Sequence, residues 1–463
     1  MRLRRMVMAC ALLTAVPAVP GTAAHAAQES SYITDEQGRV LILHGLNTAS
    51  SAKGAGGLPW IGEADVARER ELLGSNIVRY LIQWKNVEPE PGVYDEAYLD
   101  AVAERLRWYR GQGIHVVLDM HQDLYGPAAC QGQGNGAPAW ATITDGLSCT
   151  PQKPWFLSLL QPAVLRAYDN FWNHTGAHPE LGERYTAMWR HVADRFKDDP
   201  AVLGYDLMNE PFGGSRQFGF FEGPVLTPFY QRIIDAIREV DDGTWIFVEP
   251  QAVGVGQGTP SSLGRLLGDR IALAPHFYPA ALYVNRSYTG LTKSAVQAEF
   301  VAWRLSMTAL SRDLGRPLWL GEVGAIGASV PGAADYTGDW LTFADDLRIG
   351  WAYWSNDTAT DGTGIDTGVG PIDENGLTRI GRVMARPYPR AIAGLPVSIK
   401  ATAVKFTLSW RSNGATGPTE IWLPPSFGAD PKITSTASAR WDPATRILLV
   451  DGTGGAVQTV AVG

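Results

Sequence analysis

Short apolar runs alternate with stretches of helical periodicity along most of the chain. Each run has the length of a buried strand, is nearly continuous in apolar residues, and is followed by polar or aromatic residues. Eight strands are predicted, at Val40–His44, Asn76–Trp84, Ile114–Met120, Val202–Met208, Trp245–Val248, Ile271–Ala274, Pro317–Gly321 and Trp351–Trp354. Helices are predicted between most of them, at Glu63–Leu73, Tyr94–Arg110, Glu183–Phe196, Thr227–Val240, Ser294–Leu314 and Ala333–Arg348.

This alternation favours a parallel sheet with right-handed crossovers. Eight units favour closure of that sheet, so the fold class is predicted to be α/β, a (β/α)8 TIM barrel. An open, doubly wound sheet is the alternative. Such a sheet normally has a phosphate-binding glycine motif after its first strand, and the sequence has none there.

Two stretches depart from the alternation. Leu124–Leu181 reads as a long, irregular connection, rich in Gly, Pro and Trp, and a connection of this length is usually functional. From about Pro396, short strands separated by Gly, Pro and Asn predict a small antiparallel β-sandwich, with strands at 397–399, 405–410, 420–423, 447–450 and 458–462. We therefore divide the chain into a barrel domain, 30–390, and a carboxyl-terminal sandwich domain, 391–463.

The amino terminus has the pattern of a secretory signal peptide. A basic start is followed by a short apolar run and the site Ala24-His25-Ala26. The predicted signal peptide is 1–26, with cleavage near Ala26 and export of the mature chain as a secreted protein. The apolar run is too short to span a membrane, and no later stretch of the sequence qualifies.

Removal of that segment takes away three arginines and no acid, which leaves 36 basic residues against 47 acidic ones. This balance argues against nucleic acid or an anionic membrane as the main partner. In an exported chain, Cys130 and Cys149 favour a disulfide over a metal site. No cluster of metal-ligating residues has zinc or calcium spacing, so no metal or organic cofactor is expected.

Two glutamates follow strands that are distant in sequence. The fourth predicted strand stops at Asn209-Glu210-Pro211, because a proline cannot donate a ladder hydrogen bond, and the seventh ends at Glu322. A barrel brings all carboxyl ends of its strands to one rim. Two carboxylates about 5 Å apart can cleave a glycosidic bond, one donating a proton and the other attacking the anomeric carbon. For Glu210 alone, pairing with a neighbouring arginine is the simpler explanation.

Five motifs carry a resemblance to a known family. DLMNEP at Asp206–Pro211 and LGEVG at Leu320–Gly324 resemble the acid/base and nucleophile motifs of glycoside hydrolase family 5, a family of retaining barrel glycosidases. Three further stretches resemble its endoglycoceramidase subfamily: DMHQDLYG at Asp119–Gly126, GAPAW at Gly136–Trp140 and AYWSND at Ala352–Asp357. The cysteine-bearing insertion and the small β domain fit that subfamily too.

The resemblance implies a role for each matching residue. Glu210 would be the general acid/base and Glu322 the nucleophile, with Arg79 keeping Glu322 ionised and His276 as a supporting polar contact. The residues implied to bind substrate are Lys53, His121, Asp123, Asn209, Tyr278 and Trp354. From the residues alone, simpler explanations stay open: Arg79 as a buried ion pair, His121 as a strand-end histidine, and Lys53 as a solvated loop lysine.

The resemblance further implies hydrolysis of the bond between glycan and ceramide in glycosphingolipids, by a monomer without cofactors. Apolar side chains in the insertion and after Glu210 would cradle ceramide, or would pack on one another; they are Trp140, Ile143, Trp155, Phe156, Leu157, Leu159, Leu160, Phe212, Phe218, Phe220 and Phe221. An exposed patch there would mark transient contact with a membrane or micelle. Two alternatives are an endo-β-glucanase or mannanase with an open groove, and a non-catalytic glycan-binding protein. The presence of both glutamates disfavours the latter.

Overall fold

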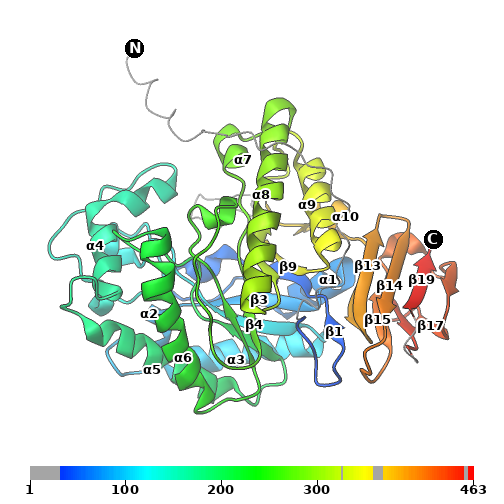
Figure 1. The fold of residues 1–463 in the computed structure, drawn as a ribbon, viewed down its shortest axis with the longest axis horizontal. Helices are drawn as coiled ribbons and strands as arrows, with labels where there is room; N and C mark the ends of the chain where they lie inside the picture. Colours follow the sequence, from blue (N-terminus) through cyan, green and yellow to red (C-terminus); the bar gives the residue numbers. More distant parts are fainter. Residues whose placement is uncertain (1–31, 325–326, 358–368, 453–456) are drawn as a thin grey trace.

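The computed structural model describes residues 32–324, 327–357, 369–452 and 457–463 (Figure 1). The predicted signal peptide and its cleavage site lie outside these residues. Eight parallel strands lie side by side in the order β7-β6-β5-β4-β3-β2-β9-β8. Two parallel bridges between the outermost strands, Leu273 to Leu318 and Phe277 to Val323, close the sheet. The predicted TIM barrel is therefore confirmed.

Apart from the first, the strands of the barrel follow the predicted runs closely. They are β2 (His44–Asn47), β3 (Ile77–Ile82), β4 (His115–Met120), β5 (Val202–Asp206), β6 (Trp245–Val248), β7 (Ile271–Leu273), β8 (Trp319–Gly324) and β9 (Gly350–Trp354). Large apolar side chains fill the interior near the amino ends of the strands, among them Val117, Phe247 and Trp319. This end is a packed core, so the polar chemistry is confined to the carboxyl rim.

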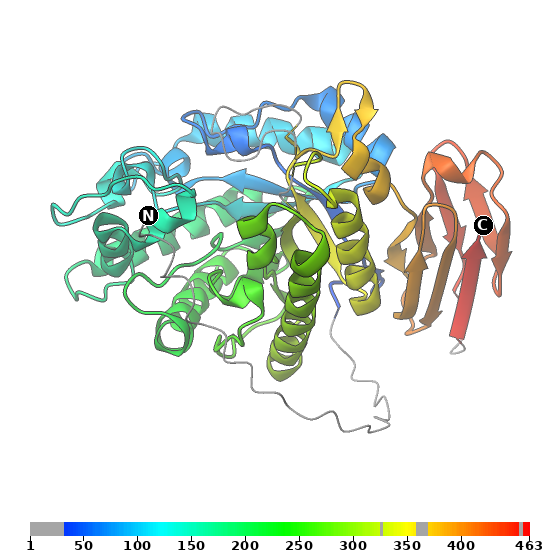
Figure 2. The same ribbon diagram turned by 90° about the horizontal axis from the view of Figure 1, so that it is seen from above.

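Helices enclose the barrel (Figures 1 and 2), and their buried apolar residues form one core with those of the strands. The longer ones are α1 (Glu63–Leu73), α3 (Glu96–Gly111), α5 (Pro179–Phe196), α6 (Thr227–Arg238), α8 (Gly290–Leu314) and α9 (Ala333–Leu347), and the shorter ones are α2 (Trp84–Val87), α4 (Pro162–Phe171), α7 (Ala280–Asn285) and α10 (Arg379–Met384). None of the helices in the described ranges is both long and apolar enough to serve as a membrane span.

The first predicted strand, Val40–His44, is wrong in its extent. Val40–Leu41 forms a separate strand, β1, which pairs antiparallel with β12 (Tyr388–Ile392) of the carboxyl-terminal domain. The barrel strand begins at His44 and ends at Asn47. His44 is buried at the amino end of the strand between Trp351 and Tyr388, and Asn47 is buried at the carboxyl end, where it contacts Arg79. Apolar periodicity gives no signal for a strand with buried polar ends.

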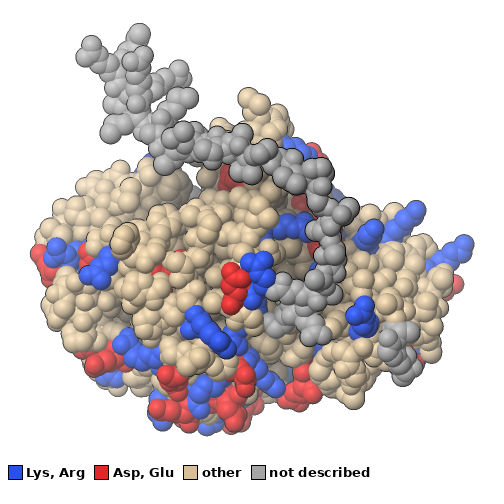
Figure 3. Space-filling view, viewed as in Figure 1, with Lys and Arg blue, Asp and Glu red and all other residues tan. Residues whose placement is uncertain are grey.

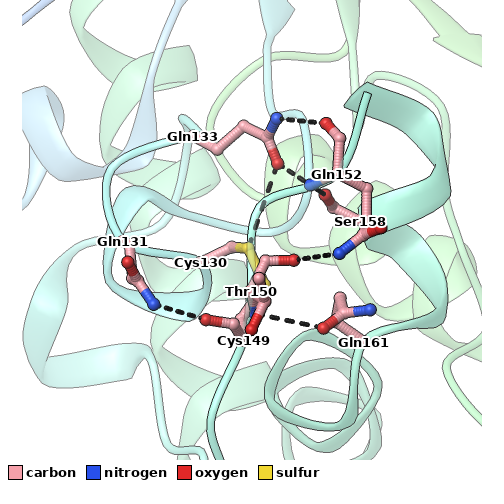
Figure 4. Close-up of a disulfide and its surroundings, with 8 residues drawn as sticks. All are labelled: Cys130, Gln131, Gln133, Cys149, Thr150, Gln152, Ser158 and Gln161. Carbon is pink, nitrogen blue, oxygen red and sulfur yellow. Dashed lines mark hydrogen bonds between the residues drawn. A yellow bond between two sulfur atoms is a disulfide. The ribbon is translucent and has the colours of Figure 1, made fainter. Parts of the chain in front are cut away.

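The prediction of an irregular Leu124–Leu181 is also wrong in part. Pro162 starts the helix α4, a favourable residue at a first helical position, and Tyr168 and Phe171 lie on its buried face. Cys130 and Cys149 form the predicted disulfide, with their Cα atoms 5.0 Å apart. Around it the side chains of Gln131 and Gln133 bind the backbone of the facing segment (Figure 4). The insertion is therefore a built substructure rather than a loose loop.

Two antiparallel sheets form the carboxyl-terminal domain, which confirms the predicted sandwich. One has the order β1-β12-β15-β18-β17 and the other β13-β14-β19-β16. The strands after β12 are β13 (Leu395–Ala401), β14 (Phe406–Arg411), β15 (Thr419–Trp422), β16 (Ile433–Ser435), β17 (Ala439–Asp442), β18 (Ile447–Val450) and β19 (Val457–Val462); β16 and β17 were not predicted. Trp422 packs flat against Gly74, the left-handed residue that ends α1, where a Cβ would lie 2.1 Å from the indole.

Candidate active site

Glu210 and Glu322 lie on the same rim of the barrel. Glu210 follows β5, and Glu322 belongs to β8. A carboxylate oxygen of each, together with a ring nitrogen of His276, fall within 4.8 Å of one another. This separation is close to the spacing of about 5 Å between the carboxyl groups of retaining glycosidases. The structure thus brings the two predicted catalytic side chains together on one rim.

The backbone of Glu210 has a left-handed conformation, with φ of +43°. Such a conformation costs a residue with a side chain about 1–2 kcal/mol. Its N–H donates to Glu249 Oε2 at 2.9 Å, and the side-chain amide of Gln122 donates to the carbonyl oxygens of Asn209 and Glu210 at 2.8 and 3.1 Å. Neighbouring side chains therefore hold this peptide in place, which is common where backbone strain serves function.

Arg79 is the centre of a buried ion cluster. Its guanidinium pairs with the carboxylates of Asp119, Asp206, Glu249 and Glu322 at 2.7 to 2.9 Å. It also donates to the side-chain oxygens of Asn47 and Asn209. Although burial opposes its charge, these acids raise the pKa of Arg79 well above its ordinary value. Arg79 is therefore a buried ion-pair residue, and one of its partners is Glu322, the candidate nucleophile, so the two explanations do not exclude each other.

The surroundings of Glu322 favour its ionised form. Its Oε1 pairs with Arg79 at 2.7 Å, and its Oε2 accepts a hydrogen bond from the Tyr278 hydroxyl at 2.7 Å. Burial alone would raise the pKa of Glu322, but the positive charges of His276 and Arg79 outweigh burial and lower it. An ionised carboxylate held at both oxygens is suited to nucleophilic attack.

Glu210 has the opposite tendency. Burial raises the pKa of its carboxyl group, and the hydrogen bond from His276 at 3.0 Å only partly offsets that rise. Its side chain is 22% exposed, whereas that of Glu322 is 6% exposed. Two neighbouring carboxyl groups whose pKa values are pushed apart are characteristic of an acid and a nucleophile.

A second polar cluster lies beside this pair. Lys53 Nζ is 2.7 Å from Asp123 Oδ2 and 4.1 Å from the centre of the Trp354 ring. The His121 ring stacks parallel to Trp354 at 5.4 Å, and Asn135 also donates to Asp123. The Lys53 side chain is 12% exposed, so the solvated alternative for this lysine is wrong. An indole face surrounded by hydrogen-bonding groups can bind a sugar ring.

Several site residues had no sequence assignment: Asn47, Asp119, Gln122, Asn135, Asp206 and Glu249. Asp119 connects the two clusters, because one oxygen pairs with Arg79 and the other lies 2.7 Å from His121 Nδ1. Each of the six lies in or just after a strand on the carboxyl rim, or in the insertion. The sequence signal that could have found most of these residues is a polar residue at the end of an apolar strand. That signal was used to assign a catalytic role only to Glu210 and Glu322.

The predicted apolar residues divide into two groups. Phe212 and Phe221 are buried, and Trp140, Ile143, Trp155 and Leu159 pack partly buried against the core. In contrast, Phe156, Leu157, Leu160, Phe218 and Phe220 are exposed by 39% to 80%. The packing explanation is therefore correct for the first group, while the second remains available to a ligand or a surface.

Glu210, His276 and Glu322 are also compact enough to surround an ion. Their partners do not suit a cation, because Arg79 is already bound to Glu322 and the pKa of His276 is raised well above its ordinary value by the surrounding acids. A metal ion would have to displace a proton from His276 and would lie close to the positive guanidinium of Arg79, which repels a cation. The arrangement is therefore better suited to proton transfer and covalent catalysis than to metal binding.

Comparisons with known proteins agree with this geometry. A family model described as cellulase (glycosyl hydrolase family 5) matches residues 34–360, and one for the glycoside hydrolase family 5 C-terminal domain matches residues 386–462. Endoglycoceramidase I of Rhodococcus hoagii is 30% identical over 431 residues, which cover 88% of this chain and 81% of that protein.

Solved structures of endo-glycoceramidase II from a Rhodococcus species are similar over almost their whole length. Its complex with ganglioside GM3 is 45% identical, with a TM-score of 0.88. Its lactosyl-enzyme intermediate is 44% identical, with a TM-score of 0.85. Both comparisons cover 93% of this chain and 99% of the other. Together with the paired glutamates on the barrel rim, these matches establish that the chain belongs to glycoside hydrolase family 5.

Proposed function

We propose that this protein is an endo-glycosidase that hydrolyses the bond between the oligosaccharide and ceramide of glycosphingolipids with retention of configuration. The observation that carries the proposal is the close pair of Glu210 and Glu322 with pKa values shifted in opposite directions. The likeness to endoglycoceramidases, one of them solved as a lactosyl-enzyme intermediate, supports the substrate class.

The reaction follows from the positions of the two carboxyl groups. Glu322 attacks the anomeric carbon while Glu210 gives its proton to the oxygen that leaves with ceramide. The glycosyl-enzyme ester then reacts with water, whose proton returns to Glu210. Two inversions at one carbon give net retention.

The sugar next to the cleaved bond would lie on the second cluster. Trp354 would form the floor, while Lys53, His121 and Asp123 would bind the hydroxyl groups. The Asn209 amide nitrogen donates one N–H to the carbonyl of Gln122, and its other N–H would meet the 2-hydroxyl.

The exposed apolar residues on the rim support a further part of the proposal, transient contact with a membrane or micelle. Leu160 in the insertion, Phe220 after β5 and Val284 in α7 are exposed by 67%, 80% and 77%. All three follow the carboxyl ends of barrel strands, on the face that holds the catalytic pair. Figure 3 shows few charges on the surface between α4 and α7, whereas the lower edge, over α3, α5 and α6, carries many. A weakly charged apolar rim suits a substrate embedded in lipid.

One experiment tests the substrate. The protein and its Glu210→Gln and Glu322→Gln variants are incubated with glycosphingolipids and with β-glucans or mannans, and the products are identified by mass. Intact ceramide and intact oligosaccharide from the wild type alone are expected. Cleavage of polysaccharide only would favour the endoglucanase alternative, and unchanged hydrolysis in both variants would refute the catalytic assignment.

Membrane contact, export and oligomeric state are tested by separate experiments. Phe220→Ser is expected to lower the fraction of protein that sediments with vesicles containing glycosphingolipid, while cleavage of a water-soluble substrate stays unchanged. Equal vesicle binding by the wild type and the variant would contradict contact between the rim and the membrane. Cleavage near Ala26 predicts a secreted chain that begins at Ala27, as read by amino-terminal sequencing. Light scattering is expected to give the mass of a monomer.

A further inference from the structure

Glu249 is a buried carboxylate that the reaction as described leaves without a role. It follows β6 directly and is 1% exposed. Its Oε1 lies 2.9 Å from Arg79 Nη2 and 3.1 Å from His276 Nε2, and its Oε2 accepts the backbone N–H of Glu210 at 2.9 Å. The Glu249 side chain therefore contacts Arg79 and His276, which hold the catalytic glutamates, and the backbone of Glu210, but it does not lie between the two glutamates.

His276 has a carboxylate on each side of its ring. Its Nδ1 lies 3.0 Å from Glu210 Oε1 and 3.6 Å from Glu322 Oε2, while its Nε2 faces Glu249. A neutral imidazole carries one N–H and can donate on one side only, so acids on both sides favour the doubly protonated ring. Trp303 fixes the backbone here by donating to the carbonyl of His276.

The charges around His276 point in the same direction. Burial alone would lower the pKa of His276, but Glu249, followed by Glu322 and Glu210, raises it well above its ordinary value. Other charged or titratable groups also face these residues. Arg79 pairs with Glu249 and Glu322 and also with Asp119 and Asp206, and the Tyr278 ring lies edge-on to the imidazole at 6.3 Å. Tyr230 donates its hydroxyl to the backbone carbonyl of Glu249 at 2.9 Å, and Lys53 and His121 add positive charge near Glu322.

The backbone contact is a second, independent observation. Glu210 has φ of +43°, and its N–H points to Glu249 Oε2. The next residue, Pro211, has no N–H to donate. The bond from the N–H of Glu210 to Glu249 therefore fixes the peptide plane from which the acid/base side chain leaves the backbone. Removal of the acceptor would leave a buried N–H unpaired and a strained conformation unsupported.

We propose that Glu249 is the positioning residue of the catalytic pair: its charge keeps His276 doubly protonated between Glu210 and Glu322, and its second oxygen fixes the backbone of the acid/base. The proposal rests on the assignment of Glu210 as acid/base. A positive His276 limits how far the pKa of Glu210 rises and helps to keep Glu322 ionised. Glu249 thereby sets the pH range of the reaction from outside the sugar site.

Glu249→Gln tests the charge. With that charge removed, His276 loses its second proton at lower pH, and the pKa values of Glu210 and Glu322 both rise. Both limbs of the plot of kcat/KM against pH are expected to move to higher pH, by about one unit. KM should change little, because Lys53 and Asp123 are untouched. A profile that stays in place, or moves to lower pH, would overturn the proposal.

Glu249→Asp separates the two roles. It keeps the negative charge, so the pH profile should stay near that of the wild type. Its side chain is one methylene shorter and does not reach the N–H of Glu210, so kcat should fall, by up to about a hundredfold. If this variant instead shifts the profile as far as Glu249→Gln does, the charge assignment is wrong.

The control is Asp241→Asn, which alters a buried carboxylate at the opposite end of β6. Asp241 accepts hydrogen bonds from the Tyr205 hydroxyl and from the backbone of Gly243 and Thr244. Its loss should lower stability and leave the pH profile unchanged. If Asp241→Asn shifts the pH profile of kcat/KM as far as Glu249→Gln does, the shift comes from general destabilisation, and the proposal is overturned.

The protonation of His276 can be read without any substrate. In protein labelled with ¹⁵N-histidine, with His276→Asn for assignment, both ring nitrogens should be protonated between pH 5 and 8, and Glu249→Gln should lose one proton within this range. A neutral ring in the wild type would refute the proposal. Because this measurement needs no turnover, an error in the proposed substrate and an error in the role of Glu249 are distinguishable.

Discussion

The hydrogen bond from Tyr278 to Glu322 gives a quantitative prediction. Tyr278→Phe removes the hydroxyl that donates to Glu322 Oε2 at 2.7 Å, and leaves the Arg79 pair on the other oxygen intact. A hydrogen bond to a charged group contributes about 1.5–3 kcal/mol. If all of it acts on the reacting carboxylate, kcat/KM falls by about ten- to a hundredfold.

The sign of the pH effect follows from the same bond. The hydroxyl stabilises the ionised form of Glu322, so its removal raises the pKa of that carboxyl group. The acidic limb of kcat/KM, which reports ionisation of the nucleophile, should then move to higher pH. The alkaline limb, which reports the proton on Glu210, should move much less, because the Tyr278 hydroxyl bonds to Glu322 and not to Glu210.

The assay is the pH dependence of kcat/KM for hydrolysis of a soluble aryl glycoside, with Tyr185→Phe as the matched control. Tyr185 is also buried, and its hydroxyl donates to the carbonyl of Leu207 at 2.8 Å, away from the catalytic carboxylates. Its removal should cost about 1 kcal/mol of stability and no activity. Equal losses in the two variants, or a wild-type acidic limb in Tyr278→Phe, would refute the reasoning.

Three further predictions concern binding and stability. Lys53→Met removes the partner of Asp123 and should raise KM about tenfold with less effect on kcat; an unchanged KM would remove Lys53 from the sugar site. Burial raises the pKa of Glu69 to about 8, so the folded form loses stability as pH rises from about 4.5 to 8. Glu69→Gln should therefore raise the free energy of unfolding, measured by urea titration, by about 3 kcal/mol more at pH 8 than at pH 5, and equal gains would contradict this. Replacing Cys130 and Cys149 by Ala should cost about 3 kcal/mol and expose the insertion to limited proteolysis, whereas wild-type resistance would show that the bond is dispensable.

The barrel could be predicted because its strands are buried on both faces. Runs such as Ile114–Met120 stay apolar throughout, and the polar residues that follow them mark one rim. The two glutamates were placed together by that rule alone. The first strand was misplaced because an apolar run does not say which sheet it joins, and β1 pairs with β12, a strand far away in the chain.

The partners of Arg79 could not be predicted in the same way. Asp119 and Asp206 lie opposite each other in neighbouring strands, so that both reach the guanidinium. Packing across the barrel fixes that register. If either strand slipped by one residue relative to its neighbour, its aspartate would point to the other face of the sheet. Helix α4 escaped prediction for another reason, because the Gly- and Pro-rich segments around it hide a single short amphipathic stretch.

The pairing of β1 with β12 has a consequence for biosynthesis. The ribosome releases β1 early, but its partner strand leaves the exit tunnel only after the whole barrel has been made. The strand β1 therefore stays unpaired while the barrel is translated, and its pairing with β12 joins the first described strand to the start of the carboxyl-terminal domain. If the chain is cut between the two domains, the carboxyl-terminal fragment loses β1 from the edge of its sheet, and the barrel fragment keeps β1 without a partner strand.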